Sequence, residues 1–466
     1  MKKNRLSSFL LALSLTLGLL APMGAAQAAE SRSAILDGME VEATAAILVD
    51  TTYGSLDVLY DQNSHERRYP ASITKVMTAL LTVEAVDNGQ LSLDDWITVG
   101  PEVNHEVGSG SSTQNIKEGE VMRLEDVLYC ALTASANEAC NVLAQAVAGS
   151  VADFVDLMNQ RAAELGMTGT HFANTHGYHN EDHYTTAYDI AIMCAEAMKH
   201  PAFRTIVSSV GHTVPATNLH EARELHETNA LVSNFRYIGY LYQYATGIKT
   251  GSTPEAGLCL ASSASRDGRD LIAVVLGCVR EPNTTGSQGM TQFSESRRLL
   301  EWGFKNFSRQ TVLDSTSLRD EVEVTLSKEA NYVGVEPQGV LEATLPTDLD
   351  PAAFTREVVL DSQSVPAPVG KGQVLGHVTV SNGDTVYGTL DLVAVSNVER
   401  SELLYRLDQI KQFFSRAEVK LGLLVLLVVV LFLLLRWLLF GRRRRSRYGS
   451  GRGGYGGSHY RGRRRR

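Results

Sequence analysis

The chain has 466 residues, of which 44% are hydrophobic and 20% are charged, and its formal net charge is −9. This length predicts two or three domains with a real buried core. The charge is unevenly distributed along the chain. The last 26 residues hold eleven arginines, the first 28 hold three cationic residues, and neither segment contains an acidic residue. The segment between them therefore has a net charge of −23. That acidic body excludes a nucleic-acid or anionic-surface binder, except through the tail.

The first 28 residues have the pattern of a secretory signal peptide. Lys2, Lys3 and Arg5 form a positive start, Phe9 to Leu20 is an apolar stretch, and Ala26-Gln27-Ala28 is a small-x-small cleavage site. The alternative is a buried first helix, which the cationic start and the Ala-x-Ala end disfavour. We therefore expect an exported protein that is cleaved before Ala29.

The next segment, residues 29–305, alternates predicted strands and helices. Strands are expected at Ala45 to Val49, Leu56 to Tyr60, Gly257 to Ala264 and Leu271 to Val279, the last two flanking an Arg266 to Arg269 hairpin. Helices are expected from Ser72, over Leu124 to Ala134, over Glu138 to Val147, and from a capping box at Thr186 to Asp189 through Met198. Helices between early and late strands of one antiparallel sheet predict an α+β, three-layer domain.

From about residue 306 to 396 the pattern changes to strands alone. Glu321 to Leu326 alternates polar and apolar residues, and Asn382-Gly383 between two β-rich runs is typical of a hairpin. This predicts a small all-β domain without a cluster of catalytic residue types, serving as a spacer or docking platform.

The C-terminal part of the chain carries membrane signals. Residues 397–420 have apolar side chains at helical spacing, which predicts an amphipathic helix that lies on the membrane or packs on the β domain. Leu421 to Phe440 is an apolar run of 20 residues, enough to cross a bilayer core of about 30 Å. Arg436 lies near one end, where it can snorkel to the interface. The Arg-rich tail, residues 441–466, should stay cytoplasmic.

The five cysteines form an odd set without tight spacing. A disulfide framework in an exported protein would show an even, patterned set. We predict mostly buried free thiols, while Cys259 and Cys278 remain a candidate pair across a hairpin.

Ser72 and Lys75 carry the first chemical signal. At a spacing of three they share one face of a helix, and a neutral lysine can take the proton of a serine nucleophile. Because a free lysine has a pKa of about 10.4, the pair needs burial or a second cation to keep the lysine neutral. A Ser-x-x-Lys string alone is weak evidence.

Two later strings give that evidence weight. Ser135-Ala136-Asn137 lies between two predicted helices, and Lys249-Thr250-Gly251 begins a predicted strand. The order Ser-x-x-Lys, Ser-x-Asn, Lys-Thr-Gly is that of penicillin-recognising serine enzymes. With its flanks, such as Gly247-Ile248 before the third motif and Ala261 to Gly268 after it, the chain resembles the D-alanyl-D-alanine carboxypeptidases among the low-molecular-mass penicillin-binding proteins.

The resemblance implies a role for each matching residue. Ser72 would be the acylated nucleophile, Lys75 its base, and Ser135 a proton relay to the leaving amine. Substrate-binding roles would fall to Asn137, Lys249, Thr250, Gly251 and Ser252, with Lys249 and Thr250 on the terminal carboxylate and Lys249 also keeping Lys75 neutral. The oxyanion hole would be the N–H groups of Ser72 and Ser252, although family members often have His where this chain has Ser252.

The same resemblance implies partners and excludes cofactors. It predicts peptidoglycan stem peptides as substrate, β-lactams as covalent inhibitors, a membrane anchor, and neither metal, cofactor nor nucleic acid. Transpeptidase or D,D-endopeptidase activity, or a non-catalytic wall-binding scaffold, are the alternatives. A class A β-lactamase would need a Glu-x-x-x-Asn loop, and the nearest approximation, Glu224 to Asn229, is off by one and too close to Lys249.

Two further patterns have rival interpretations. Four histidines with Glu181 and Asp182 crowd 13 residues and invite a metal site, although their spacing fits no standard motif; they are His171, His176, His179 and His183. The Arg/Gly/Tyr tail resembles RNA-binding segments, but a topology signal that also binds anionic lipid is the simpler interpretation.

Overall fold

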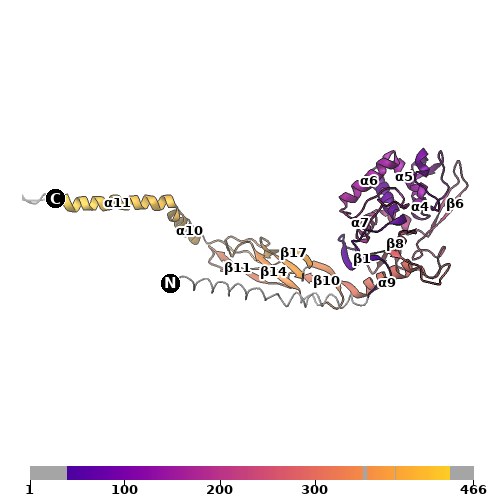
Figure 1. Cartoon of the computed structure of the whole chain (residues 1–466). Helices are drawn as coiled ribbons and strands as arrows, with labels where there is room; N and C mark the ends of the chain where they lie inside the picture. Colours follow the sequence, from indigo (N-terminus) through magenta and orange to yellow (C-terminus); the bar gives the residue numbers. More distant parts are fainter. Residues whose placement is uncertain (1–38, 350–353, 384, 441–466) are drawn as a thin grey trace, which may run out of the picture. The chain divides into compact units, whose positions relative to one another are not determined.

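The computed structural model describes residues 39–349, 354–383 and 385–440 (Figure 1). The predicted signal peptide, the cleavage site and the Arg-rich tail lie outside the described residues. The chain divides into two compact units, the first built mainly from residues up to Val312 and the second mainly from Leu313 onward, with Leu341–Thr355 and Val380–Gly388 counted in the first.

The first unit is built on a five-stranded sheet with the order β2-β1-β9-β8-β7. The strands are β1 (Ala45–Asp50), β2 (Asp57–Gln62), β7 (Ala245–Thr253), β8 (Gly257–Arg266) and β9 (Arg269–Cys278). All four pairings are antiparallel. The earliest strand of this sheet, β1, pairs with the latest, β9, and Ile47 lies opposite Val274. Strand β7 is therefore an edge strand, with backbone groups free of a second neighbour.

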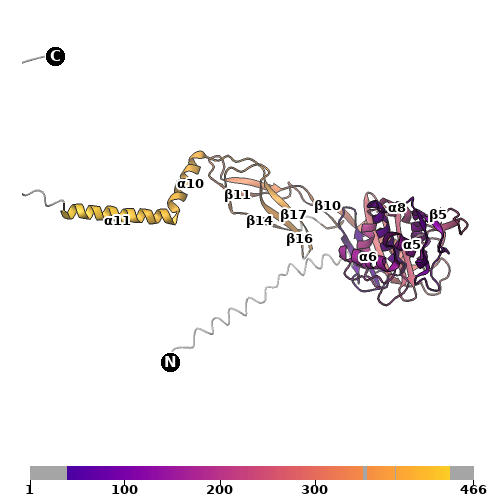
Figure 2. The same cartoon turned by 90° about the horizontal axis from the view of Figure 1, so that it is seen from above.

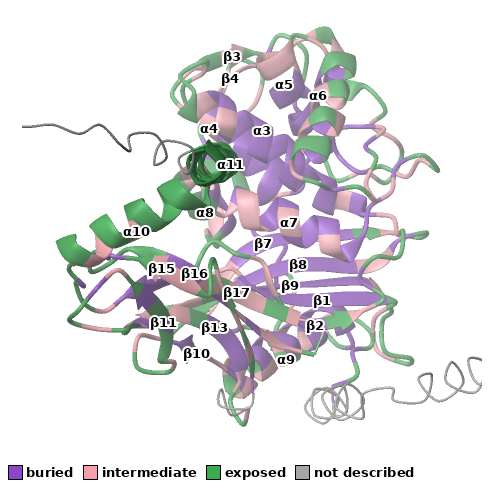
Figure 3. Cartoon of the chain, turned by 90° about the vertical axis from the view of Figure 1, so that its left-hand side faces the viewer, coloured by how far each residue is buried: buried purple, intermediate pink, exposed green. Residues whose placement is uncertain are grey.

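The sheet lies between two helical layers (Figure 3). Because side chains alternate along a strand, Ala45, Ile47 and Val49 of β1 join one hydrophobic core and Ala46 and Leu48 join the other. The first core includes the helices α3 to α8, within residues 75–207, and the second includes helix α9 (Thr291–Asn306). Figure 1 shows α5 and α6 on one side of β1 and β8 and α9 on the other, and Figure 2 shows the same unit from above. The predicted three-layer α+β domain with a central antiparallel sheet is confirmed.

The four helices expected in the first unit all form, and its described residues also contain four helical segments that were not predicted. Together they are the 3-10 turn η1 (Ala71–Thr74), α3 (Lys75–Asp87), η2 (Pro101–Asn104), α4 (Leu124–Leu132), α5 (Asn137–Ala148), α6 (Val151–Glu164), α7 (Ala187–Ala197), α8 (Pro201–Val207) and α9 (Thr291–Asn306). The expected capping residue of α7, Thr186, accepts a hydrogen bond from the N–H of Asp189. This unit also contains two small two-stranded sheets. They are β3 (Trp96–Thr98) with β4 (Val121–Arg123), and β5 (Gly211–Val214) with β6 (Arg223–His226).

The later part of the chain is all-β, as predicted. Strands β10 (Phe307–Leu313) and β13 (Leu341–Pro346) form a pair, and six others form a sheet with the order β14-β16-β17-β12-β11-β15. These are β11 (Asp320–Thr325), β12 (Tyr332–Pro337), β14 (Thr355–Leu360), β15 (Ser364–Pro366), β16 (Val374–Asn382) and β17 (Thr385–Ala394). Strands β16 and β17 are neighbours on either side of the predicted Asn382-Gly383 turn. The boundaries 306 and 396 of this domain stay a prediction.

Two helices end the described chain, and their boundaries differ from the expected ones. Helix α10 (Glu402–Ser415) begins at the N-cap Ser401 and has no buried residue, so its apolar side chains face outward. Helix α11 (Ala417–Phe440) has 24 residues, and it is long and apolar enough to cross a membrane. The chain bends at Arg416, whose backbone is extended, so residues 417–420 belong to the long apolar helix and not to the amphipathic one.

All five cysteines are buried free thiols. Cys259 lies opposite Gly251 and Cys278 opposite Leu258, so the candidate pair does not face across the β8–β9 hairpin. The prediction of buried free thiols is confirmed, and the Cys259–Cys278 disulfide is absent.

Candidate active site

The nucleophile candidate, Ser72, lies in a tight turn directly before a buried helix. Ala71, the residue before it, has a φ of 48°, in the left-handed region that a residue with a side chain rarely adopts. Lys75 is the first residue of α3, so one turn of chain joins the two side chains. Such strain is held by the surrounding packing, and it is common at sites of chemistry.

Lys75 is fully buried and uses all three of its N–H donors. Its Nζ lies 2.9 Å from Ser72 Oγ, 2.7 Å from Asn137 Oδ1 and 2.8 Å from the carbonyl oxygen of His176. Burial lowers the pKa of Lys75 from 10.5 to about 8, while Cys140 and Glu138 act in the opposite direction. A lysine with this pKa can exchange a proton with the serine hydroxyl near neutral pH.

Asn137 is held in place from two sides. It is the first residue of α5, its backbone N–H donates to the carbonyl of Ser112 (2.9 Å), and its amide nitrogen donates to Ser111 Oγ (2.9 Å). With both donors fixed, its amide oxygen points to Lys75. Ser135, two residues earlier in the loop between α4 and α5, is nearly buried and has a φ of 63°. Asn137 of the second motif is thus held beside Lys75 of the first.

The third motif meets the first through Gly251. A Cβ added to Gly251 would lie 2.9 Å from the carbonyl oxygen of Pro70 and 3.1 Å from the backbone nitrogen of Ser72, so only glycine permits this approach. Lys249 lies two residues earlier on β7 and therefore leaves the strand on the same face, toward Ser72. Thr250 and Ser252 alternate with them, and Ser252 is exposed on this edge strand.

Lys249 is as deeply buried as Lys75. Its Nζ donates to the carbonyl oxygen of Thr250 at 3.2 Å. Burial lowers the pKa of Lys249, repulsion by Lys75 lowers it further, and attraction by Glu227 opposes both. The leading cause of the lowered pKa of Lys75 is burial, so the second cation is not what chiefly sets it. The two ammonium groups together make a site that favours an anion.

The loop that supplies the His176 carbonyl is fixed by its own side chains. The amide oxygen of Asn174 accepts the N–H of Gly177 (2.8 Å), and Thr175 donates to Asn141 Oδ1 (2.6 Å). Gly177 has a φ of +85°, and a Cβ there would lie 1.8 Å from the carbonyl oxygen of Ala71. The sequence did not reveal the role of this loop, because a backbone acceptor such as the His176 carbonyl leaves no residue-type signal. Ser111 was missed for a similar reason, as serine is common in loops.

The four clustered histidines make separate contacts. His183 is buried, with Nε2 2.8 Å from Thr74 Oγ1 and Nδ1 accepting the N–H of Ala173 (3.1 Å). Burial lowers the pKa of His183 and of His176 to about 3, so both rings stay neutral. His171 Nδ1 contacts the carbonyl of Asp182 at 2.6 Å. The bonds of His183 to Thr74 and to Ala173 support the loop around the Ser72 turn.

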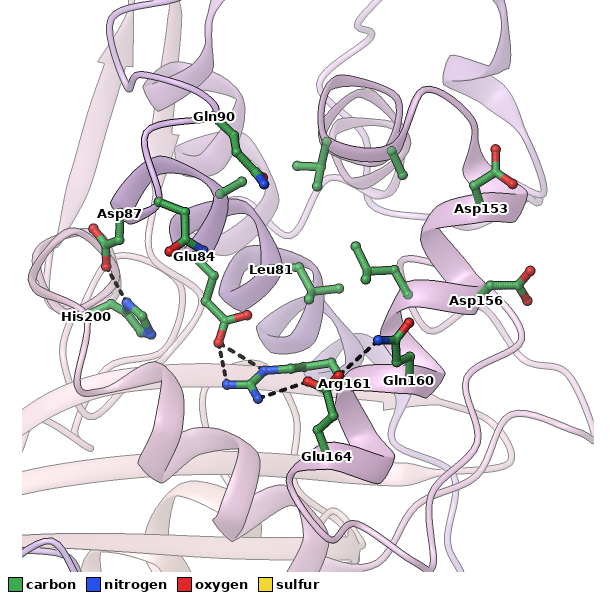
Figure 4. A pocket seen from close by; sticks show the side chains of 15 residues that line it. Leu81, Glu84, Asp87, Gln90, Asp153, Asp156, Gln160, Arg161, Glu164 and His200 are labelled. Atoms are coloured by element: carbon green, nitrogen blue, oxygen red, sulfur yellow. Dashed lines mark hydrogen bonds and ion pairs between the residues drawn. The ribbon is translucent and has the colours of Figure 1, made fainter.

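A separate groove lies at the other end of α3 (Figure 4). Glu84 and His200 line this groove, and together with Glu196 they have ligand atoms within 4.8 Å of one another. Figure 4 shows Arg161 of α6 against Glu84, and it donates to Glu84 Oε1 (2.6 Å) and to Glu196 Oε1 (3.4 Å). The Arg161 guanidinium supplies the positive charge that a metal ion would bring to Glu84 and Glu196. We therefore interpret this group as an ion-pair network. Glu84 lies nine residues from Lys75, about 13 Å along the helix, and is remote from the site.

The sequence of this chain is similar to those of known proteins. Residues 27–279 match the family model described as D-alanyl-D-alanine carboxypeptidase, and residues 341–400 match penicillin-binding protein 5, C-terminal domain. The D-alanyl-D-alanine carboxypeptidase DacC of Escherichia coli K12 is 31% identical over 376 residues, 78% of this chain and 86% of that protein. DacF of Bacillus subtilis strain 168 is 28% identical over 360 residues, 77% of this chain and 87% of that one.

Solved structures agree in fold. Penicillin binding protein 5 of Haemophilus influenzae has a TM-score of 0.59 at 25% identity, covering 78% of this chain and 99% of that one. Penicillin binding protein 6B of Escherichia coli has a TM-score of 0.58 at 27% identity, covering 76% and 96%.

Proposed function

The chain belongs to the D-alanyl-D-alanine carboxypeptidase family, and we propose that it removes the terminal D-alanine from peptidoglycan stem pentapeptides through an acyl-enzyme on Ser72. The observation that carries the proposal is the 2.9 Å contact between Lys75 Nζ and Ser72 Oγ inside a buried, cation-rich site. A lysine in that position can take the proton of the serine hydroxyl and later return it, as the activation of a serine nucleophile requires.

Acylation begins when neutral Lys75 takes the proton of the Ser72 hydroxyl. The Ser72 oxygen then forms a bond to the carbonyl carbon between the two D-alanines. The negative charge that develops on the carbonyl oxygen is stabilised by the N–H groups of Ser72 and Ser252, with β7 offering its free edge. The C–N bond breaks as the proton reaches the leaving nitrogen through Lys75 and Ser135, and D-alanine departs.

Deacylation repeats the same proton transfers with water. Water loses a proton to the lysine and attacks the ester carbon, the bond to Ser72 breaks, and the serine oxygen regains a proton. Asn137 holds Lys75 in place through both half-reactions, because its amide oxygen is 2.7 Å from Nζ and its own donors are fixed. The products are a tetrapeptide carboxylate and the free enzyme.

Recognition of the terminal carboxylate falls to the third motif. Lys249 supplies the positive charge, Thr250 a hydroxyl donor, and Gly251 the space that lets the Ser72 turn approach the strand. An extended peptide can add to the edge of β7, as peptides do on other exposed strands. β-Lactams carry a carboxylate and a reactive carbonyl in a similar relation, so they would acylate Ser72 as substrate mimics.

The location follows from the chain ends. We infer that residues 1–28 direct export and that residues 421–440, within helix α11, anchor the protein as a single-pass membrane protein. The eleven arginines after the helix keep the tail in the cytoplasm, where they also attract anionic lipid. The catalytic domain then works outside the membrane.

Covalent labelling tests the proposal. Fluorescent penicillin should label the wild type and not Ser72→Ala, and mass spectrometry should place the label on Ser72. A wild type that takes no label would leave the non-catalytic wall-binding scaffold as the better account. Digestion of purified muropeptides separates the carboxypeptidase, which releases free D-alanine, from a D,D-endopeptidase or transpeptidase, which changes the cross-links.

A further inference from the structure

A buried carboxyl group with no assigned role lies behind the Lys-Thr-Gly strand. Glu227 follows β6 and is 1% exposed. Its Oε1 accepts the backbone N–H of Asn229 at 2.7 Å, while its Oε2 is buried without a hydrogen-bond partner among the described residues. The Asn229 amide in turn donates to the carbonyl of Gly247 at 2.9 Å, which fixes this segment against β7.

Two hydroxyl groups connect this carboxyl to the substrate site. Thr250 Oγ1 donates to Thr228 Oγ1 at 2.8 Å, and Thr228 Oγ1 donates to Glu227 Oε1 at 3.3 Å. A hydroxyl has one hydrogen to donate. While this order holds, the hydrogen of Thr250 is turned toward Thr228 and away from any ligand. Thr250 then offers a substrate carboxylate only lone pairs, which repel it.

Protonation of Glu227 allows the opposite order. A neutral Glu227 can donate its proton to Thr228 Oγ1, Thr228 can then donate to Thr250 Oγ1, and the hydrogen of Thr250 becomes free for a ligand. No heavy atom has to move, since all three oxygens keep their positions and only the hydrogens change sides. The distances of 2.8 Å between Thr250 and Thr228 and of 3.3 Å between Thr228 and Glu227 therefore serve both directions.

We propose that Glu227 is a positioning residue whose protonation sets the direction of the Glu227–Thr228–Thr250 hydroxyl relay, so that Thr250 donates to the substrate's terminal carboxylate only when Glu227 is neutral. The inference rests on the proposed function, because it assigns the carboxylate subsite of the same enzyme.

The surroundings of Glu227 favour such a switch. Burial raises the pKa of Glu227, attraction by the Lys249 ammonium lowers it, and the bonds from Asn229 and Thr228 also lower it, with burial the largest cause. Lys249 is itself acted on by Lys75 of α3, Cys140 of α5 and Arg236 of the loop before β7. A raised carboxyl pKa means that Glu227 is neutral at the acidic end of the working range and ionised at the alkaline end.

Two variants separate the relay from a structural role. In Glu227→Gln the amide oxygen still accepts from Asn229 and from Thr228, which keeps the turn and locks the relay in its ionised direction at every pH. In Thr228→Val the relay is cut, and the hydrogen of Thr250 is free at every pH. The exposed Glu224→Gln on β6 is the matched control, since Glu224 bonds only Thr213 among the described contacts.

The experiment measures KM and kcat for a stem pentapeptide from pH 5.5 to 9 with the full-length enzyme in detergent. At low pH the KM of Glu227→Gln should exceed that of the wild type about three- to tenfold, the effect of one hydrogen bond, and the two should converge at high pH. Thr228→Val should match the wild type at low pH and have the lower KM at high pH. The control should follow the wild type throughout, and kcat should change little in any variant.

Constant ratios of KM across the pH range for both variants, with an active wild type, would overturn the relay. So would a Thr228→Val enzyme with the KM of the wild type at every pH. Acylation by fluorescent penicillin is measured in parallel. A wild type that labels on Ser72 but shows those ratios refutes the relay alone, whereas a wild type that neither labels nor releases D-alanine refutes the proposed function.

Discussion

Lys75 Nζ lies 2.9 Å from Ser72 Oγ, and the Lys75 side chain is completely buried, so the base contacts the nucleophile directly and away from solvent. Burial brings the pKa of this lysine down to about 8. Below that pH the lysine is protonated and cannot accept the serine proton. The rate of acylation should therefore rise with pH as Lys75 loses its proton.

We expect the first-order acylation rate at saturating penicillin to rise about tenfold per pH unit up to pH 8 and then to level off. Lys75→Arg, whose side chain stays charged, should fail to acylate at every pH. Stopped-flow labelling from pH 6 to 9 measures this. A rate that is the same at pH 6 and pH 8 would show that Lys75 is not the base.

Gly251→Ala should lower acylation about 100-fold while leaving the fold intact. The added Cβ would lie 2.9 Å from the Pro70 carbonyl oxygen and 3.1 Å from the Ser72 nitrogen, so the turn that holds Ser72 has to move. Labelling kinetics and thermal melting give the two readouts. Gly370→Ala is the control, because nothing lies within 4 Å of the Cβ it would add. Acylation at the wild-type rate in Gly251→Ala would refute the close approach.

Arg223→Met should destabilise the catalytic unit by about 3–5 kcal/mol, because it leaves the Glu120 carboxylate buried without its partner. Arg223 Nη2 donates to Glu120 at 2.7 and 3.0 Å, and its Nε donates to the carbonyl of Gln114 in the loop before β4. Denaturant unfolding measures the loss. The exposed Lys199→Gln should cost less than about 1 kcal/mol, and equal losses in the two variants would contradict the argument.

Truncation before Glu402 should convert the protein from a membrane form to a soluble one. It removes α10 and α11, which have no buried residue, and every buried residue of the described chain lies before Glu402. Phase separation in Triton X-114 should place the full chain in the detergent phase and the truncated chain in the aqueous phase. A full chain in the aqueous phase would show that α11 does not anchor the protein in a membrane.

Residue types and spacing were enough to predict most of the site, but not its backbone contacts. Ser72 with Lys75 is a local signal, and the order of the three motifs gave Asn137 and Lys249. The His176 carbonyl had no such signal, since every residue has one. Thr228 and Glu227 lie about 20 residues before Lys249 in sequence, and only the pairing of that segment with β7 brings them to Thr250.

The fold shows the same division. The apolar run of β1 and the capping box at Thr186 are local patterns, and both elements form where expected. The break at Arg416 was not predicted, because the helical periodicity of the amphipathic segment runs into the apolar one without a proline or glycine. The pairing of Cys259 and Cys278 was left open, since register across a hairpin depends on bulges such as the one between Leu258 and Leu260.

Release of free D-alanine tests the central claim most directly. Purified muropeptide monomers with a pentapeptide stem, and cross-linked dimers beside them, are incubated with the wild type and with Ser72→Ala, and the products are resolved by mass spectrometry. We predict that the wild type converts pentapeptides to tetrapeptides with one D-alanine released per turnover, that the cross-links persist, and that Ser72→Ala does neither conversion nor release. D-alanine release that survives in Ser72→Ala, or a wild type that leaves pentapeptides intact, would contradict the account.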